Sequence, residues 1–468
     1  MIVGGKVLKT SSTISSYISD YLNEKGYNLK QFSTICEINV GSLSAMLTGK
    51  RFLSIKQLDN LTRVMGLVEG YFYETYAAEC FMEIDPHWKR LKPFLFRCSQ
   101  LDMLECINRV VQHITDNRSY LNELFDVGEK WYREGLYKAS LILYQCLTES
   151  EKYHHSTRLA LCQYRIFAIK ISMNQRNNIS AAAQFEPYIE KLEEEVQLDA
   201  IKDLAHVYLT MRYWDSVYLL AEQLERKADF QIKMQSNSKR RSKRIAIYPL
   251  YAYKAYANLL KANICLEHQE YEKALEFTKK CEEIVDIANP APEEQEITER
   301  FRNWAEGNRY LYSISVGKCE ILDAYLNYIE KNSSEILVAF VYIVEAANKH
   351  IFNIDNALDR FDYHIKSFHT DKCLKGVYTN QILNYRTIRF YHSLARYRIN
   401  QQRWTYAINN LLTSLELSIN CDDDFWVIQC VDLYGQYRIY SNENQEQKYV
   451  LLMERIVKRK LVDIENID

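Results

Sequence analysis

Residues 262–281, ANICLEHQEYEKALEFTKKC, contain the pattern that decides the fold. Ala262 and Cys265 are small residues one helical turn apart. Tyr271 then begins a second segment, in which Ala274 and Cys281 recur at helical spacing. This predicts two helices that pack closely as a hairpin. The same arrangement recurs at 124–144, 201–221 and 391–411, and weaker copies are centred on Gly307 and Ala347.

The repeated hairpin matches the tetratricopeptide pattern, in which W-x2-L-G-x2-Y in one helix precedes A-x3-F in the next over ~34 residues. In the first copy, Gly128 and Trp131 stand in the first helix and Tyr137 and Tyr144 in the second. Small residues let the two helices approach, and aromatic rings fill the space between hairpins. Such hairpins stack into a right-handed superhelix with a concave face. We expect this peptide-binding and dimerisation array over residues 119–468.

One polar position recurs in the first helix of each hairpin, directly after the small residue. We expect it to face partly into the concave groove. It is occupied by Glu129 in the first copy and then by the five candidate peptide-binding residues His206, Asn263, Asn308, Asn348 and Arg396. An asparagine amide offers an acceptor and two donors, so it can pair with both the N–H and the C=O of an extended peptide. An arginine there can hold a peptide carboxylate. The alternative is that each is only a solvated polar residue.

The first 75 residues predict a small helical bundle. Thr13 or the serines before it can cap a first helix that Gly26 ends, and Asn28 and Asn39 can cap two short helices separated by a tight turn. A fourth apolar periodicity runs from Ile55 to Met65. Two short helices joined by such a turn predict a helix-turn-helix. A helical bundle without a DNA role is the alternative.

The turn and its flanking segments resemble the Cro/Xre repressor class, through Ser33, the Ile38-Asn39 turn and Thr48-Gly49-Lys50-Arg51. In this arrangement the third helix faces base edges with Val40, Gly41, Ser42, Ser44 and Ala45. None of these can make a bidentate base contact. The residues expected to bind phosphates are Lys30, Thr48, Lys50 and Arg51. A head with such weak base contacts should act as two copies on two half-sites, which predicts a dimer. We expect its surface in the C-terminal repeats, which contain Tyr434, Tyr437, Tyr440 and Leu451.

Composition favours an all-α protein. The 468 residues include only 13 glycines and 6 prolines, and the net charge is −2. Residues 76–118, in which Pro86 and Pro93 interrupt helical patterns, predict a packed helical connector. We find no membrane span, secretion signal, metal-ligand spacing or catalytic constellation, so we expect a cytoplasmic protein that is not an enzyme and needs no cofactor. The fold predicted is a helix-turn-helix bundle followed by a right-handed tetratricopeptide superhelix.

This architecture resembles the RRNPP family, the peptide-pheromone receptors of Gram-positive bacteria and their phages. The resemblance covers nearly the whole chain and includes Gly307-Asn308 within Phe301–Tyr310. It implies a cytoplasmic homodimer that binds a short signalling peptide, changes its DNA binding in response, and clamps the peptide backbone with Asn263, Asn308 and Asn348. The alternative is a protein-interaction scaffold, or a regulator of a response-regulator phosphatase pathway, with a vestigial head.

Overall fold

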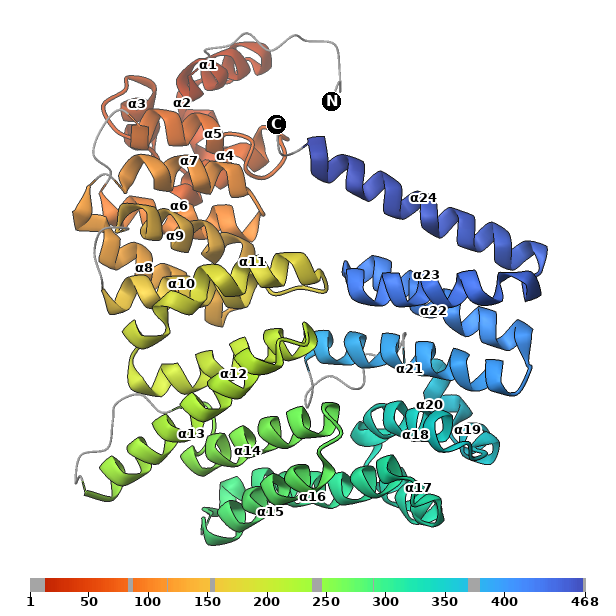
Figure 1. Ribbon diagram of the computed structural model, residues 1–468. Coiled ribbons are helices and arrows are strands. Elements are labelled where there is room, and N and C mark those ends of the chain that lie inside the picture. Colours follow the sequence, from red (N-terminus) through yellow and green to blue (C-terminus); the bar gives the residue numbers. More distant parts are fainter. Residues whose placement is uncertain are drawn as a thin grey trace. The chain divides into compact units, whose positions relative to one another are not determined.

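The protein is all-α, as the sequence predicts. The computed structural model describes residues 13–82, 87–115, 117–151, 156–237, 246–288, 290–368 and 379–465. These ranges consist of helices joined by turns and contain no β-strand (Figure 1). None of their helices has both the length and the apolar content that crossing a bilayer requires. The chain divides into two compact units, residues 1–169 and 170–468.

The first three helices begin at the capping residues that the sequence predicts, and the fourth begins after Ser54. They are α1 (Ile14–Lys25), α2 (Leu29–Ile35), α3 (Val40–Leu47) and α4 (Ile55–Val64). Thr13, Asn28, Asn39 and Ser54 are their N-caps, and each side chain accepts a hydrogen bond from a backbone amide two or three residues further on. Gly26 ends α1 in the left-handed region, with φ 68°.

A tight turn joins α2 to α3. Glu37 has a left-handed φ of 56°, and the amide of Ile38 donates to the carbonyl of Ser33 at 3.0 Å. The Ile38 side chain is buried beside Phe32 and Leu43 in the core of the first unit. The turn therefore fixes the angle between the two short helices through both its backbone and its buried side chain.

The first unit continues through a connector and two further helix pairs. Its remaining helices are α5 (Tyr73–Ala77), α6 (Trp88–Gln100), α7 (Leu104–Ile114), α8 (Leu121–Arg133), α9 (Tyr137–Ser150) and α10 (Thr157–Lys170). The expectation that Pro93 interrupts a helix is wrong. Helix α6 continues through Pro93, and a proline at this position removes one backbone hydrogen bond. Pro86 lies outside the described residues.

The head formed by α1–α4 shares one apolar core with the connector. Leu58 of α4 and Phe94 of α6 are fully buried in the same cluster. Asp59 adds polar ties, since its carboxylate accepts from the Tyr73 hydroxyl at 2.6 Å and from Nε of Arg97 at 3.2 Å. The head is therefore an integral part of the first unit. The boundaries drawn from sequence at 75 and 118 both fall inside that unit.

The second unit is a succession of helical hairpins. Its helices are α11 (Gln175–Phe185), α12 (Glu194–Thr210), α13 (Trp214–Asn237), α14 (Leu250–Glu267), α15 (Tyr271–Ile287), α16 (Gln295–Val316), α17 (Leu322–Lys331), α18 (Ile336–His350), α19 (Asp355–Arg360), α20 (Asp362–Ser367), α21 (Asn380–Asn400), α22 (Trp404–Cys421), α23 (Asp424–Tyr437) and α24 (Glu443–Glu465). The pairs α12/α13, α14/α15 and α21/α22 are hairpins at three of the expected copies, and α8/α9 in the first unit is the fourth.

These four hairpins share one turn. The second residue after the first helix is left-handed in each, with φ of 79° at Gly135, 62° at Arg212, 61° at Gln269 and 58° at Gln402. The next amide donates back to the carbonyl five residues earlier, at 2.7–3.0 Å. Three of the four residues carry a side chain, so the turn recurs without the glycine that usually marks it.

Small residues allow the close helix approach that the pattern predicts. A Cβ on Gly128 of α8 would lie 3.1 Å from the ring of Tyr144 on α9. On Gly307 of α16 it would lie 2.9 Å from the hydroxyl of Tyr328 on α17. Both separations are shorter than ordinary contacts, so a larger residue would push the helices apart.

The two ends of the second unit contact each other. Helices α12 and α21 pack side by side (Figure 1). In addition, the Asn174 amide, just before α11, donates to Asp422 at 2.8 Å, and the Arg212 guanidinium, just after α12, pairs with Asp423 at 3.2 Å. The same guanidinium lies 4.0 Å from the centre of the Phe425 ring. This unit is thus closed by contacts between residues more than two hundred positions apart in the chain.

Candidate functional site

The expected DNA-contacting residues lie on the accessible side of α2, α3 and the segment after them. Val40 is 39% exposed, Ser42 is partly buried, and the remaining five are exposed: Lys30, Ser44, Thr48, Lys50 and Arg51. The opposite side of α3 is in the core through Leu43 and Met46. The helix therefore presents a small, nearly uncharged surface flanked by basic residues.

Two backbone hydrogen bonds hold the basic pair at the end of α3. Gly49 has a φ of 68°, and the amides of Lys50 and Arg51 both donate to the carbonyl of Ala45, at 2.8 and 3.2 Å. Within the described ranges, neither side chain has an ion-pair partner. The Thr48 hydroxyl donates to the Ser44 carbonyl at 3.0 Å, so only its oxygen lone pairs remain for another group. Two unpaired cations beside a helix end are suited to phosphate binding.

Three adjoining cavities lie along α14, α16, α18 and α21 in the second unit. The first and second share Leu266 and Tyr342, and the second and third share Glu345 and Lys349. Each cavity therefore adjoins the next, and we call the three together the inner groove. Most of its lining residues belong to the first helices of successive hairpins.

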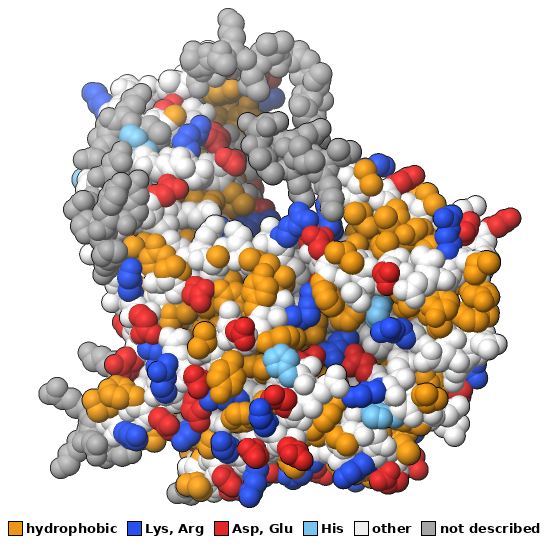
Figure 2. All heavy atoms as spheres, viewed as in Figure 1, with side chains coloured by type: hydrophobic (Ala, Val, Ile, Leu, Met, Phe, Trp, Pro, Cys, Tyr) orange, Lys and Arg blue, Asp and Glu red, His pale blue; other side chains and the backbone are white. Residues whose placement is uncertain are grey.

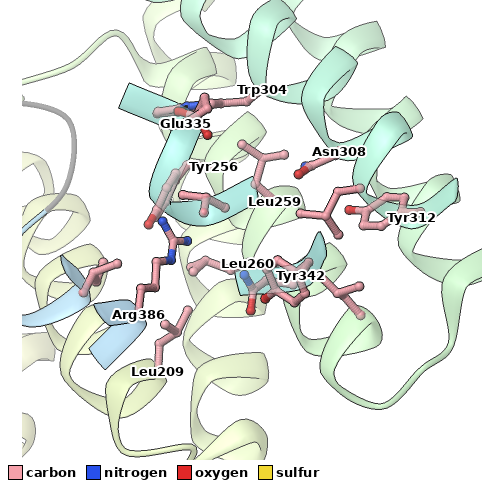
Figure 3. A pocket seen from close by; sticks show the side chains of 15 residues that line it. Leu209, Tyr256, Leu259, Leu260, Trp304, Asn308, Tyr312, Glu335, Tyr342 and Arg386 are labelled. Atoms are coloured by element: carbon pink, nitrogen blue, oxygen red, sulfur yellow. Dashed lines mark hydrogen bonds between the residues drawn. The ribbon is translucent and has the colours of Figure 1, made fainter. Parts of the chain in front are cut away.

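The first cavity is an apolar pocket of about 100 Å³ that holds two of the expected asparagines. Asn263 lines it from α14 and Asn308 from α16, where Asn308 points toward Leu259 (Figure 3). Most of the wall is aliphatic or aromatic, with Leu209, Leu259, Leu260, Leu266, Leu311, Val338, Ile382, Tyr256, Trp304, Tyr312 and Tyr342. Arg386 and Glu335 add one charge of each sign (Figure 3). In the described part of the chain, neither asparagine amide has a hydrogen-bond partner. Both can bind a polar ligand group.

His206 lies behind this pocket and supports its wall. Its Nε2 is 2.5 Å from the hydroxyl of Tyr256, which lines the cavity. Burial, together with the positive charge of Lys202, lowers the pKa of His206 to about 4. The imidazole is therefore neutral at pH 7 and positions Tyr256, rather than facing the groove itself.

The second cavity contains a buried ionic network that the sequence reasoning missed. Arg389 of α21 pairs with both oxygens of Glu345 on α18, at 2.6 and 2.8 Å, and with Glu267 of α14 at 2.6 Å. The Tyr342 hydroxyl donates to Glu267 at 2.8 Å. Burial opposes the charge on Arg389, yet the two carboxylates hold its pKa well above the usual range. The network links α14, α18 and α21 at the wall of the second cavity.

The third cavity, of about 480 Å³, brings together Asn348 and Arg396. The Asn348 amide is already engaged, since its Nδ2 donates to the Ser393 carbonyl at 2.8 Å. Arg396 is exposed, and no described carboxylate pairs with it. His392 also lines the cavity, and burial followed by the charge of Arg396 lowers its pKa to about 4. The five expected positions thus separate into two in the apolar pocket, two in this cavity and one behind the pocket wall.

The expected dimer surface at the C-terminal end is only partly accessible. Tyr434 is 1% exposed and stacks on Tyr449 with ring centres 3.8 Å apart, so it belongs to the core. Tyr440 stacks on Trp404 at 3.9 Å and is 47% exposed, and Leu451 is 60% exposed. Of the residues considered, Tyr440 and Leu451 therefore remain available to a partner.

Charge is distributed evenly on the face shown in Figure 2. Acidic and basic side chains alternate over the hairpins of the second unit, without a broad basic area there. In the described ranges no group of three or more His, Cys, Asp or Glu side chains could hold a metal ion. The basic run at 239–244 lies outside the described residues.

Comparison with known proteins adds no family to this geometry. No protein-family model, curated protein or solved structure matches the chain. Its function must therefore be inferred from its own residues.

Proposed function

We propose that this chain is a cytoplasmic, homodimeric transcriptional regulator whose DNA binding is controlled by a short linear peptide bound in the inner groove. This is the function that the resemblance to RRNPP receptors implies, with α2 and α3 as its helix-turn-helix and the hairpins as tetratricopeptide repeats. The observation that carries the proposal is the pair of unengaged amides, Asn263 and Asn308, in one apolar pocket.

A peptide fits this pocket better than a small apolar molecule does. An extended backbone presents N–H and C=O groups that must be paired when they leave water, and a side-chain amide satisfies both kinds. Aliphatic walls accept a side chain and add affinity through buried area. Because the pocket continues into two further cavities, the ligand can be longer than one residue.

The head supports DNA binding through shape and charge more than through base reading. Lys50 and Arg51 are exposed, unpaired and held beside the end of α3. Val40 can contact a thymine methyl group, but no side chain expected at a base edge can pair bidentately with a base. Such a head gains affinity and specificity from two half-sites bound by a dimer.

Peptide control requires two conformations that bind the peptide unequally. The head shares its core with α6, so it cannot swivel alone and must move with the first unit. A hairpin array is sensitive to a ligand that bridges several repeats. In this chain a change of pitch must keep or break the contacts of Asn174 and Arg212 with Asp422 and Asp423. A peptide spanning the inner groove would favour one pitch.

The test is retention of sheared host genomic DNA by the full-length protein, with DNA upstream of its own gene included. We expect Lys50→Glu with Arg51→Glu to lower retention at least tenfold, while Lys89→Glu with Lys92→Glu, the same charge change on exposed α6 residues, leaves it nearly unchanged. Equal retention by both double variants would overturn the assignment of the head.

The peptide arm of the test adds a random hexapeptide pool to the DNA-bound protein. We expect the pool to change retention by the parent and to have a much smaller effect on Asn263→Ala with Asn308→Ala. A parent that binds the pool but retains no DNA would overturn the regulator and favour the interaction scaffold instead.

A further inference from the structure

We propose that the third cavity is a carboxylate subsite, in which Lys349 and Arg396 bind an anionic group of the peptide and thereby fix its direction in the inner groove. This inference rests on the proposed function, because it names the chemistry of the ligand at one end of the same groove. Lys349 thereby joins the arginine contact expected from the sequence, and the two ends of the inner groove bind different groups of the same peptide.

The charges lining this cavity do not cancel. Glu345 is its one acidic lining residue, and both oxygens of that carboxylate pair with Arg389 at 2.6 and 2.8 Å. Lys349 donates to the neutral amide oxygen of Gln269 at 2.6 Å, and Arg396 has no carboxylate partner among the described residues. Two cations therefore face a cavity whose one acidic lining residue, Glu345, is held by Arg389, which it shares with Glu267.

The other polar lining residues of this cavity add no negative charge that would oppose an anion. The Asn400 amide donates to Asn348 at 3.4 Å, and Asn348 itself donates to a backbone carbonyl. Burial keeps His392 neutral at pH 7 by lowering its pKa to about 4. Arg396 can present its planar guanidinium to two oxygens at once, while Lys349 acts as a movable point charge.

The other end of the groove has the opposite preference. The pocket around Asn263 and Asn308 is lined mainly by aliphatic and aromatic side chains, and its two charged lining residues, Arg386 and Glu335, carry opposite charges, so it suits an apolar side chain. Between the two ends, Arg389 is shared by Glu345 and Glu267, so this group keeps one excess negative charge and does not attract a ligand carboxylate. A peptide with an apolar residue toward one end and a carboxylate toward the other therefore fits in only one direction.

The carboxylate can be the C-terminus of the peptide or an Asp or Glu side chain. The probes that separate these sources are two random hexapeptide pools, both N-acetylated, one with a free C-terminal carboxylate and one C-terminally amidated. Each pool is incubated with the full-length protein, and retained peptides are identified by mass spectrometry. The variants are Arg396→Gln with Lys349→Gln and the matched control Lys318→Gln with Lys331→Gln, which removes two exposed charges outside the groove.

We expect the parent and the control to enrich peptides that carry a carboxylate at least tenfold over those that carry none. Enrichment confined to the free-acid pool assigns the subsite to the C-terminus, and enrichment of Asp- or Glu-containing amidated peptides assigns it to a side chain. The Arg396→Gln, Lys349→Gln double variant should lose most of this preference while still retaining peptides with apolar residues. Each single variant should lose part of it.

Equal retention of peptides with and without a carboxylate would overturn the subsite and leave peptide binding intact. So would an unchanged preference in the double variant. Failure of the parent to retain peptides from either pool would overturn the proposed function itself, and the subsite with it. A thermal melt of each variant confirms that it is folded, as expected for the loss of two exposed side chains.

Discussion

Asn348 differs from Asn263 and Asn308 because its amide is engaged within the protein. It donates to the Ser393 carbonyl at 2.8 Å, and the other two have no described partner. We predict that Asn348→Ala lowers the free energy of unfolding by ~1 kcal/mol, and up to ~3 kcal/mol if the carbonyl is left unpaired. Asn308→Ala should change it by less than ~0.5 kcal/mol. Urea unfolding measures both, and equal losses would show that the three asparagines are alike.

Two neutral histidines predict a pH dependence of stability. Burial lowers the pKa of His206 and of His392 to about 4, below the usual value near ~6.5 of an unfolded chain. Below pH ~6.5 the unfolded state takes up protons that the folded state does not, so stability is full above that pH and falls as pH is lowered toward 4. At pH 5 the loss has an upper limit of roughly 2 kcal/mol for each histidine.

The measurement is urea unfolding at pH 7.5 and pH 5 for the parent, His206→Gln and His392→Gln. Each variant should lose less stability than the parent over this interval. His268→Gln, at an exposed position, is the control and should behave like the parent. A parent whose unfolding free energy is the same at both pH values would contradict the prediction.

For single residues, the sequence indicated which side chains line the inner groove more accurately than it indicated their hydrogen bonds. The repeat position identified Asn263 and Asn308 because small neighbours fix which side of the helix faces inward. It could not distinguish Asn348, whose partner is a backbone carbonyl 45 residues away. Nor did it identify Arg389, although a charge between Ile388 and Phe390 in a buried stretch of helix signals a required partner.

At the scale of elements, the network around Arg389 holds α14, α18 and α21 in fixed positions. Removing one partner of a buried ion pair leaves the other charges uncompensated. We therefore predict that Arg389→Gln lowers the free energy of unfolding by ~3–5 kcal/mol, because it strands both Glu345 and Glu267. Arg396→Gln, on the same helix but exposed and without an ion pair, should cost less than ~0.5 kcal/mol. Similar costs for the two variants in urea unfolding would contradict a structural role for the network.

Helix ends and hairpins could be predicted because their causes are local. Thr13, Asn28 and Asn39 cap backbone amides within three residues, so their sequence signal is direct. The contact between α12 and α21 could not be predicted, because Arg212 and Asp423 meet only after the intervening hairpins have curved. A packed connector was expected, but the contact of α4 with α6 could not be assigned, since the apolar sides of the two helices each resemble an ordinary helix face.

At the scale of the whole molecule, the remaining prediction is self-association. α24 presents an exposed apolar strip in which Val450 is 50%, Leu451 60% and Val457 55% accessible, and Tyr440 just before it is 47% accessible. A C2 dimer buries the same patch on both subunits, so one substitution alters the interface twice. Light scattering at micromolar concentration should give twice the 55.4 kDa chain mass for the parent.

Leu451→Glu should shift that equilibrium toward the monomer, because two like charges would then have to be buried in one interface, and DNA retention should fall with it. Ile287→Glu provides the matched control, since it introduces the same charge at an exposed apolar residue that is 82% accessible and belongs to α15. Both variants should melt like the parent, because neither side chain is in a core. A parent that is monomeric with and without DNA would contradict the dimer. A Leu451→Glu variant that remains dimeric would place the interface elsewhere on the chain.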